Sequence, residues 1–289
     1  MLRHHPKGLL YIVGNEAAER FSYYGMKAIL VVFMTTYLVD SSGVLRTMSE
    51  SDATFWYHIF GMANYFVPVF GAIIADAVLG KYRTIILLSV VYCLGHLALA
   101  VDDTRFGLSI GLALIAIGSG GIKPCVSAHL GDQYHNTPAG RISEGYSLFY
   151  IAINIGAFIS TLATPVLLQR YGPQVAFAVP GVLMAVATLI FWMGRTVYVA
   201  QPPTPFRHYV SELRDAEQRA ATVRVLALFT ALSVFWALFD QTGSSWVLQA
   251  EHMNRVVELP FGVRVELLAS QIQALNPILI LILAPLFTW

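Results

Sequence analysis

Glu16-Ala-Ala-Glu19-Arg20-Phe-Ser-Tyr23-Tyr24-Gly-Met-Lys27 lies within an apolar segment, residues 9–39, that is long enough to cross a bilayer. Ionisable side chains inside such a segment are unfavourable by at least roughly 2.5–3.5 kcal/mol each at the bilayer centre. At about 100° per residue, the charged and phenolic side chains of this stretch fall within a wedge of roughly 140° on one helix face. Their alignment predicts a water-accessible substrate cavity in which protons are exchanged. The alternatives are a structural polar seam between helices and charges that reach the membrane surface.

The composition is that of a membrane protein with several spans. Of the 289 residues, 56% are hydrophobic and 12% are charged, and the mean hydropathy is +0.63. A soluble domain carries about twice this charged fraction. The expected partner is therefore the lipid bilayer, and neither the net charge of +1 nor any basic patch indicates nucleic acid. No cleavable signal peptide is expected, because the first apolar run is too long.

The chain lacks the patterns of a metal site or an active site. Cys93 and Cys125 both lie in apolar segments and are interpreted as packing residues, without a disulfide. We found no metal-ligand spacing and no Ser/His/Asp or Cys/His arrangement. We therefore expect neither an enzyme nor a metal or other cofactor, with protons as the only coupling ion.

Apolar segments of spanning length recur along the chain. They cover residues 9–39, 53–79, 84–101, 106–131, 145–169, 174–194 and 225–250, and an eighth begins near residue 272. With the N-terminus in the cytoplasm, the cytoplasmic connections hold about twice as many Lys and Arg residues as the opposite ones, which favours this orientation. The expected location is the plasma membrane, or the inner membrane of a bacterium.

A charged stretch separates the sixth segment from the seventh. It opens with Pro202-Pro203-Thr-Pro205, which ends one helix, and its remainder is helix-prone. Six helices, a linker and further helices is the order of the major facilitator architecture. We predict an all-α membrane fold with a six-helix bundle (1–195), a cytoplasmic linker helix (196–224) and the first two helices of an incomplete C-terminal bundle (225–289). The missing C-terminal bundle is an expected partner.

The second segment combines a polar face with a charged end. His58 and Tyr65 are seven residues apart and share a helix face; for His58, proton exchange and a hydrogen bond to a neighbouring helix are both open. At the end of the segment, an acid and a basic turn predict a clasp that gates or packs the cytoplasmic side. Its residues are Asp76, Gly80, Lys81 and Arg83.

Two further polar groups interrupt the fourth and fifth segments. Lys123, in Gly118-Ser-Gly-Gly-Ile-Lys123-Pro124, is expected to pair with Glu16 or Glu19 and to bind a substrate carboxylate in turn. Tyr150 and Asn154 present a hydroxyl and an amide on one face, suited either to a peptide-like ligand or to interhelical hydrogen bonds.

The seventh segment repeats this pattern in the second bundle. It reads Phe235-Trp236-Ala-Leu-Phe239-Asp240-Gln241. Asp240 is an acid amid apolar residues, expected without a partner, and is therefore a candidate for proton exchange. Trp236 is a candidate wall for an apolar side-chain pocket, with simple packing as the alternative.

Together these residues resemble the proton-dependent oligopeptide transporter family of the major facilitator superfamily. The resemblance covers essentially the whole chain, in order. It rests on Glu16-x-x-Glu19-Arg20-Phe-Ser-Tyr-Tyr-Gly, Asp76 to Arg83, Gly-Ile-Lys123-Pro, Phe-Tyr150-x-x-Ile-Asn154-x-Gly and Phe-Trp236-Ala-Leu-Phe-Asp240-Gln-x-Gly-Ser.

The resemblance implies uptake of di- and tripeptides together with protons. It assigns proton coupling to Glu16, Glu19 and Arg20, and it implies a peptide site with Lys123 near the peptide carboxylate. The other expected lining residues are Arg20, Tyr23, Tyr24, Lys27, Tyr65 and Asn154. Tyr150 matches a functionally important tyrosine of the animal members.

Several features depart from the family pattern. Lys27 stands where many members have Arg, so bidentate carboxylate binding is not expected there. Asp240 replaces the Glu common in bacterial members, whereas His58 resembles the animal ones. The chain also has no room for the two extra helices of many bacterial members. It stops within the eighth helix of about twelve.

The expected mechanism is an exchange of ion pairs. Protonation of an acid in the Glu16, Glu19 and Arg20 cluster, or of Asp240, releases a cation that then binds the peptide carboxylate and biases two packings of the bundles. One alternative is another solute in the same scaffold, such as an amino acid, nitrate or a drug. A second alternative is a peptide-binding membrane fragment that does not transport.

Overall fold

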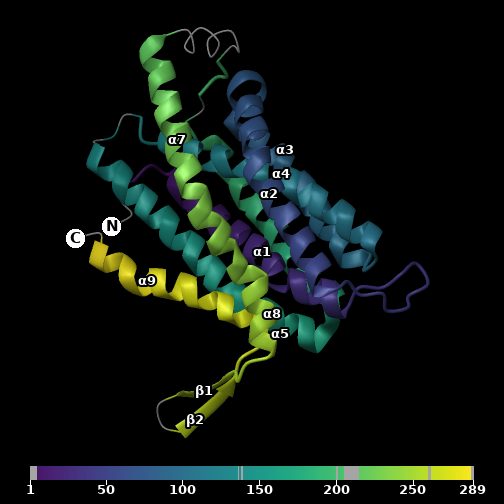
Figure 1. Cartoon of the computed structure of the whole chain (residues 1–289). Coiled ribbons are helices and arrows are strands. Elements are labelled where there is room, and N and C mark those ends of the chain that lie inside the picture. The colour runs from purple at the N-terminus through teal and green to yellow at the C-terminus, as the bar shows by residue number, and fades with distance from the viewer. Residues whose placement is uncertain are drawn as a thin grey trace.

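The computed structural model describes residues 5–135, 137, 139–199, 201–204, 215–259 and 262–287. Long helices make up most of this chain (Figure 1). They are α1 (Gly8–Thr36), α2 (Glu50–Ile74), α3 (Lys81–Val101), α4 (Arg105–Asp132), α5 (Ala139–Met193), α7 (Ala216–Phe239), α8 (Ser245–Glu251) and α9 (Leu275–Phe287). A π-helical turn (Ala75–Leu79) ends α2, and 3₁₀ turns follow α5 (Gly194–Thr196), follow α7 (Asp240–Gly243) and precede α9 (Ala269–Ala274).

Local sequence sets where these helices begin. The side chain of Ser49 accepts a hydrogen bond from the backbone N–H of Asp52 at the start of α2, and Thr104 and Asp215 cap α4 and α7 in the same way. Gly80 adopts a φ of 79° between the π-helical turn and α3, a conformation that favours glycine.

Helix α5 contains two of the predicted segments. Its helical path breaks at Gly172, where φ is 81°, and Pro173 follows directly. A proline begins a helix easily because its missing N–H would be unpaired in the first turn. The separate segments 145–169 and 174–194 are therefore confirmed, as the two limbs of α5.

Five helical stretches of the described chain are long and apolar enough to cross a membrane. They are Glu50–Leu79, Lys81–Val101, Arg105–Asp132, Gly140–Thr196 and Ala216–Glu251. Helix α1, with 29 residues, is also long enough to span, at about 1.5 Å per residue. It differs from the others by the ionisable residues in its middle.

Helices α1 to α5 form a first bundle around a continuous apolar core. Helix α1 packs along α5, and α4 packs between α2 and α3. In the core, the rings of Phe33 and Phe177 meet edge to face, 5.1 Å apart, beside the buried Met26 and Ile29. This packing fixes α1 in the interior, so its polar side chains face neighbouring helices.

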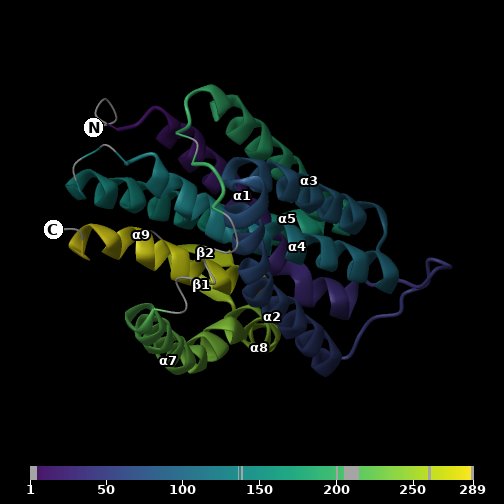
Figure 2. The ribbon, with the colours of Figure 1, turned by 90° about the horizontal axis from the view of Figure 1, so that it is seen from above.

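Helices α7, α8 and α9 form a second part that meets the first bundle near one end of α7. Helix α7 has no buried residue along Ala216–Phe239, and it lies at the edge of the molecule in the view from above (Figure 2). Contacts begin beyond it, where Gln271 donates to the carbonyl of Leu162 at 2.8 Å and Gln273 to that of Ala28 at 3.2 Å. We call this region, residues 240–275 against α1, α2 and α5, the closed end.

Two features differ from the sequence-based picture. Residues 256–266 contain an antiparallel hairpin of β1 (Val256–Leu259) and β2 (Val263–Glu266) that projects beyond the helices (Figure 1), whereas we expected only helices. Most of the expected linker helix, residues 205–214, lies outside the described residues, and 216–224 already belong to α7. The division at residues 195 and 224 stays a prediction.

Gly156 permits the close contact of α5 with α1, and its replacement by Ala is expected to destabilise the protein. A Cβ at this position would strike the carbonyl oxygen of Ala17 and lie 3.1 Å from the Cβ of Arg20. Overpacking of this kind is unfavourable by about 1–3 kcal/mol. Thermal unfolding in detergent micelles measures the effect. The control is Gly140→Ala in the same helix, where nothing lies within 4 Å of the added carbon; equal midpoints for the two variants would contradict the assignment.

Candidate functional site

The acidic residues of α1 share one arginine. Arg20 Nε lies 2.7 Å from Glu16 Oε1 and 2.7 Å from Glu19 Oε2. The spacing of four residues places Glu16 one helical turn from Arg20, and the Ser119 hydroxyl of α4 donates to Glu19 Oε1 at 3.5 Å. All three ionisable residues are at most 7% exposed. Burial is tolerable because each carboxylate is paired with the guanidinium.

The predicted polar face of α1 divides into two zones. Glu16, Glu19 and Arg20 are enclosed by the first bundle and are absent from the lining of the cavity between the two parts, whereas Tyr24 and Lys27 do line it. The expectation that the whole face opens onto one wet chamber is therefore wrong for the first three residues in this conformation. The guanidinium replaces water as the partner of both acids.

Lys123 has a different neighbour from the one expected. Its Nζ lies over the ring of Tyr23, 4.0 Å from the centroid, and Arg20 Cζ is 5.9 Å from the same ring. The expected ion pair with Glu16 or Glu19 is not formed, because Arg20 already holds both carboxylates on its own helix. Lys123 is half-buried, and no carboxylate of the described residues lies within ion-pair distance of it.

Asp240 is paired, which corrects the expectation of an isolated acid. Lys27 Nζ of α1 lies 2.9 Å from Asp240 Oδ1, and the two side chains are 12% and 13% exposed. The ammonium also lies over the ring of Tyr57, 5.1 Å from its centroid. Gly61 of α2 leaves room for the carboxylate, since a Cβ there would lie 3.9 Å from Asp240 Oδ2. This ion pair joins the first bundle to the second part.

A second polar contact crosses the closed end. His58 Nε2 of α2 and the hydroxyl of Ser244 share a hydrogen bond of 3.0 Å. Beside it, Gly243 packs so tightly on Tyr57 that a Cβ would overlap the phenol oxygen. The closed end is thus held by an ion pair, a histidine hydrogen bond and a tight glycine contact.

A cavity of about 170 Å³ lies between the two parts next to the Lys27–Asp240 pair. Its walls combine both charges with phenol, amide and apolar groups. The lining residues are Tyr24, Lys27, Tyr57, Ile153, Asn154, Ala157, Thr161, Phe239, Asp240, Thr242, Trp246, Ile272, Gln273, Leu275, Asn276 and Pro277. Such a mixture suits a small ligand that has both charged ends and apolar side chains.

Only some of these lining residues were expected from the sequence. Tyr24, Lys27 and Asn154 were expected there and Asp240 was expected only as a proton-exchanging acid, whereas Tyr57, Trp246, Gln273 and Asn276 were not expected. The last two are amides before Pro277 at the start of an apolar run, and their spacing of three residues on one helix face was a signal that could have revealed them.

Tyr23 lies outside this lining, and so do three further candidates. Tyr65, Tyr150 and Trp236 are 58%, 48% and 44% exposed. Tyr65 is near enough to Asp240 and Lys27 to interact electrostatically with both, and Trp236 packs edge to face on Phe239 with centroids 5.4 Å apart. Asn154 Nδ2 donates to the carbonyl of Tyr150 at 2.8 Å within their own helix. Their roles in binding stay predictions.

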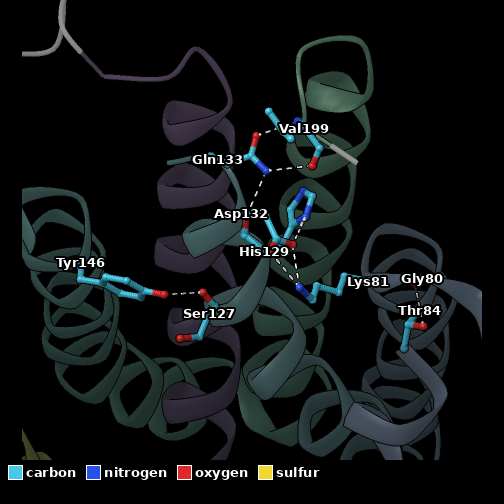
Figure 3. A network of polar contacts seen from close by, with 9 residues as sticks. All are labelled: Gly80, Lys81, Thr84, Ser127, His129, Asp132, Gln133, Tyr146 and Val199. Atoms are coloured by element: carbon cyan, nitrogen blue, oxygen red, sulfur yellow. Dashed lines mark hydrogen bonds and ion pairs between the residues drawn. The ribbon is translucent and has the colours of Figure 1, made fainter. Parts of the chain in front are cut away.

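The clasp at the end of α2 uses an acid that we had not expected. Lys81 Nζ lies 2.9 and 2.7 Å from the two carboxylate oxygens of Asp132 at the end of α4 (Figure 3). The side chain of Asp76 is not the partner; its backbone carbonyl accepts from the N–H of Thr204 at 2.6 Å. The sharp turn at Gly80 aims Lys81 towards α4, while Arg83 is exposed.

Replacement of Lys81 by Met is expected to loosen this end of the bundle. It leaves Asp132, which is 16% exposed, with His129 at 4.0 Å as its only ion-pair partner among the described residues. A charge-assisted hydrogen bond is worth about 1.5–3 kcal/mol. Hydrogen exchange at the α3 and α4 ends should rise at least about tenfold. Arg83→Met is the matched control; similar exchange in both variants would show that the pair does not hold the helices together.

Long apolar helices in two sets, with a charged cavity between them and an ion pair across it, are the arrangement expected of a membrane protein of the two-bundle type. A sequence profile of the POT family matches residues 82–206 and 202–289, and the chain belongs to this family of proton-dependent oligopeptide transporters. The all-α, major facilitator fold class is thereby confirmed.

Similar proteins agree with this assignment. The chain is 40% identical to human "Solute carrier family 15 member 2" and 38% identical to "Peptide transporter family 1" of Drosophila melanogaster, with 98% and 99% of the chain aligned. It spans 44% and 43% of these relatives, less than half their length. Among solved structures, the POT family transporter PepTSo is 32% identical with a TM-score of 0.82, covering 98% of this chain and 69% of that one.

Proposed function

We propose that this chain supplies the first bundle, and the start of the second, of a transporter that couples inward proton movement to the uptake of di- and tripeptides. A relative that is named a peptide transporter supports this proposal. The observation that carries it is the position of Lys123 without an ion-pair partner among the described residues. Lys123 is the half-buried basic residue beside the acidic cluster that has no carboxylate partner in the described chain, whereas Arg20 has two such partners and Lys27 has one.

A peptide carboxylate supplies the missing partner. A half-buried ammonium is stabilised when an anion approaches it, and a charge-assisted hydrogen bond is stronger than a neutral one. The other charge of a zwitterionic peptide, its ammonium, is suited to Asp240 in the neighbouring cavity. Tyr24 and Asn154 line the same cavity and offer uncharged contacts to the peptide backbone.

We explain proton coupling by competition between protons and basic side chains for the same carboxylates. A proton on Asp240 removes the negative charge that holds Lys27, and the only ion pair between α1 and the second part is then lost among the described residues. A proton on Glu16 or Glu19 weakens the hold on Arg20 in the same way. Because Glu16 and Glu19 share Arg20, a proton there is assigned to this cluster and not to a single residue. His58 is a further candidate, through its bond to Ser244.

These exchanges provide the switch between two packings. The closed end is held by Lys27–Asp240 and His58–Ser244, whereas α7 is exposed along its length. We place the N-terminus in the cytoplasm of a plasma membrane or bacterial inner membrane, so the closed end faces outwards. The complete cycle is assigned to a protein that contains a full second bundle, the partner expected for α7 to α9.

The test is uptake of labelled dialanine by proteoliposomes that contain the protein, with an inward proton gradient. We expect uptake that a protonophore abolishes and that Glu19→Gln reduces to a few per cent. Glu50→Gln, at the exposed start of α2, is the matched control and should transport normally. Unchanged driven uptake in Glu19→Gln would contradict the mechanism.

The same assay separates the alternatives. Inhibition of dialanine uptake by nitrate or single amino acids, at concentrations similar to dipeptides, would favour another solute. Saturable dialanine binding without uptake would favour a peptide-binding fragment that does not transport.

A further inference from the structure

A second cavity opens beside the hairpin, on the far side of the closed end from the Lys27–Asp240 site. Its volume is about 290 Å³, just below the range of about 300–1,000 Å³ that is typical of small-ligand pockets. One wall comes from the first bundle, through the ends of α1 and the first limb of α5, and includes Tyr37 and Gln169. The other wall comes from the second part, through Glu251, Arg255 and Ser270.

The two charges of this cavity are poorly compensated by the protein. Glu251, the last residue of α8, is exposed and forms no ion pair or side-chain hydrogen bond among the described residues. Arg255 approaches an acid only at 3.9 Å, through Nη2 and the largely exposed Glu266. Glu251 and Arg255 are therefore available to a ligand with one charge of each sign.

The guanidinium of Arg255 carries a further sign of an incomplete site. Its Nη1 donates to the carbonyl of Ala250 at 2.9 Å, which holds the side chain in place. Its Nε is buried and has no hydrogen-bond partner, although buried donors are nearly always satisfied. The guanidinium is thus held in place through Nη1, while its Nη2 has only a long contact with Glu266, and such a group suits a ligand carboxylate.

We propose that this cavity binds a small zwitterion, either a free amino acid or the charged ends of a short peptide. The ligand carboxylate pairs with Arg255 and its ammonium with Glu251, while Ser270 and Gln169 offer neutral hydrogen-bonding groups. Val32 and Leu168 supply a small apolar surface for a side chain. A ligand with a single charge would leave one of the two protein charges without a partner.

Such a ligand would bridge the two parts of the protein. One wall of the cavity comes from α1 and α5, and the other comes from residues 251–270. A bound ligand therefore contacts both parts and holds the closed end together. Binding here therefore stabilises this packing over one in which the two parts separate, by the difference in affinity between the two packings.

The experiment measures protection of a cysteine introduced at the exposed position 169 (Gln169→Cys). A membrane-impermeant maleimide modifies the protein in nanodiscs, and mass spectrometry quantifies the adduct on the peptide that contains this position. Alanine and dialanine are expected to slow modification at least about fivefold. N-acetyl-dialanine and dialanine amide, which each lack one charge, are expected to protect little.

Matched variants identify the two charges. In the Gln169→Cys protein, Glu251→Gln and Arg255→Gln should each remove the protection. Glu258→Gln and Arg264→Gln in the neighbouring hairpin, where the two residues pair while 66% and 73% exposed, should preserve it. If Arg255→Gln fails to fold, Glu251→Gln and the capped peptides still decide.

Two outcomes overturn the proposal. They are the absence of protection by alanine and dialanine, and equal protection in Glu251→Gln and Glu258→Gln. The readout requires no transport, and it should be unchanged in Lys123→Gln. Failure of the proposed peptide uptake and failure of this site are therefore distinguishable.

Discussion

Lys123→Gln is expected to lower the affinity for dialanine by about 10- to 100-fold and to leave the affinity for dialanine amide nearly unchanged. A hydrogen bond to a charged group is worth about 1.5–3 kcal/mol, and about 1.4 kcal/mol corresponds to a tenfold change in affinity. Dialanine amide lacks the carboxylate that we assign to the Lys123 ammonium, so its affinity should change little when Lys123 is replaced. Inhibition of labelled dialanine exchange by each ligand gives both affinities.

The control for this prediction is Lys7→Gln, which removes an exposed ammonium just before α1. It should bind both ligands like the unchanged protein. A parallel loss of affinity for the peptide and its amide in Lys123→Gln would place Lys123 in the structure of the cavity and not at the peptide carboxylate.

Asp240→Asn is expected to destabilise the described packing by up to about 3–5 kcal/mol, because it leaves the Lys27 ammonium largely buried without a counter-charge. The double variant Lys27→Gln with Asp240→Asn should recover much of this loss, since neither charge then remains. The coupling free energy of this double-mutant cycle, from unfolding in a denaturing detergent, measures the interaction.

A second double-mutant cycle, on an exposed ion pair, gives a reference value for that coupling free energy. The Glu258–Arg264 pair of the hairpin has a similar length of 2.8 Å but is exposed, and exposed pairs are worth about 0–1 kcal/mol. A coupling free energy for Lys27–Asp240 no larger than that of the hairpin pair would contradict its role in holding the two parts together.

The helices were predictable because their signal is long and local. Apolar runs of spanning length, interrupted by turn residues such as Gly80 and Gly172, indicate where helices lie and where they break. The face that carries Glu16, Glu19 and Arg20 was also predictable, since helical periodicity alone aligns these residues.

The ionic partners were not predictable, because they depend on which helices lie side by side. The sequence offers Lys123 two acidic partners, Glu16 and Glu19. Both carboxylates pair instead with Arg20, which is one helical turn from Glu16. Lys27 and Asp240 are separated by most of the chain, so no sequence spacing relates them. No sequence spacing relates Lys81 to Asp132 either, because they lie on different helices.

The irregular region after α7 was also missed. A continuous helix over 225–250 fits the apolar composition, but the chain forms a 3₁₀ turn at Asp240–Gly243 before α8. This break places Asp240 next to Lys27 and Gly243 against Tyr57. Tertiary contacts with the first bundle therefore decide the local structure there, where helix propensity is only a weak preference.

The most direct test of proton coupling is the movement of protons driven by peptide alone. Proteoliposomes enclose a pH-sensitive dye, start without a proton gradient, and receive dialanine outside. We expect that the lumen acidifies as peptide enters, and that Glu19→Gln loses this acidification while it still exchanges labelled dialanine. Entry of dialanine without acidification in the unchanged protein, or equal acidification in Glu19→Gln, would contradict this expectation.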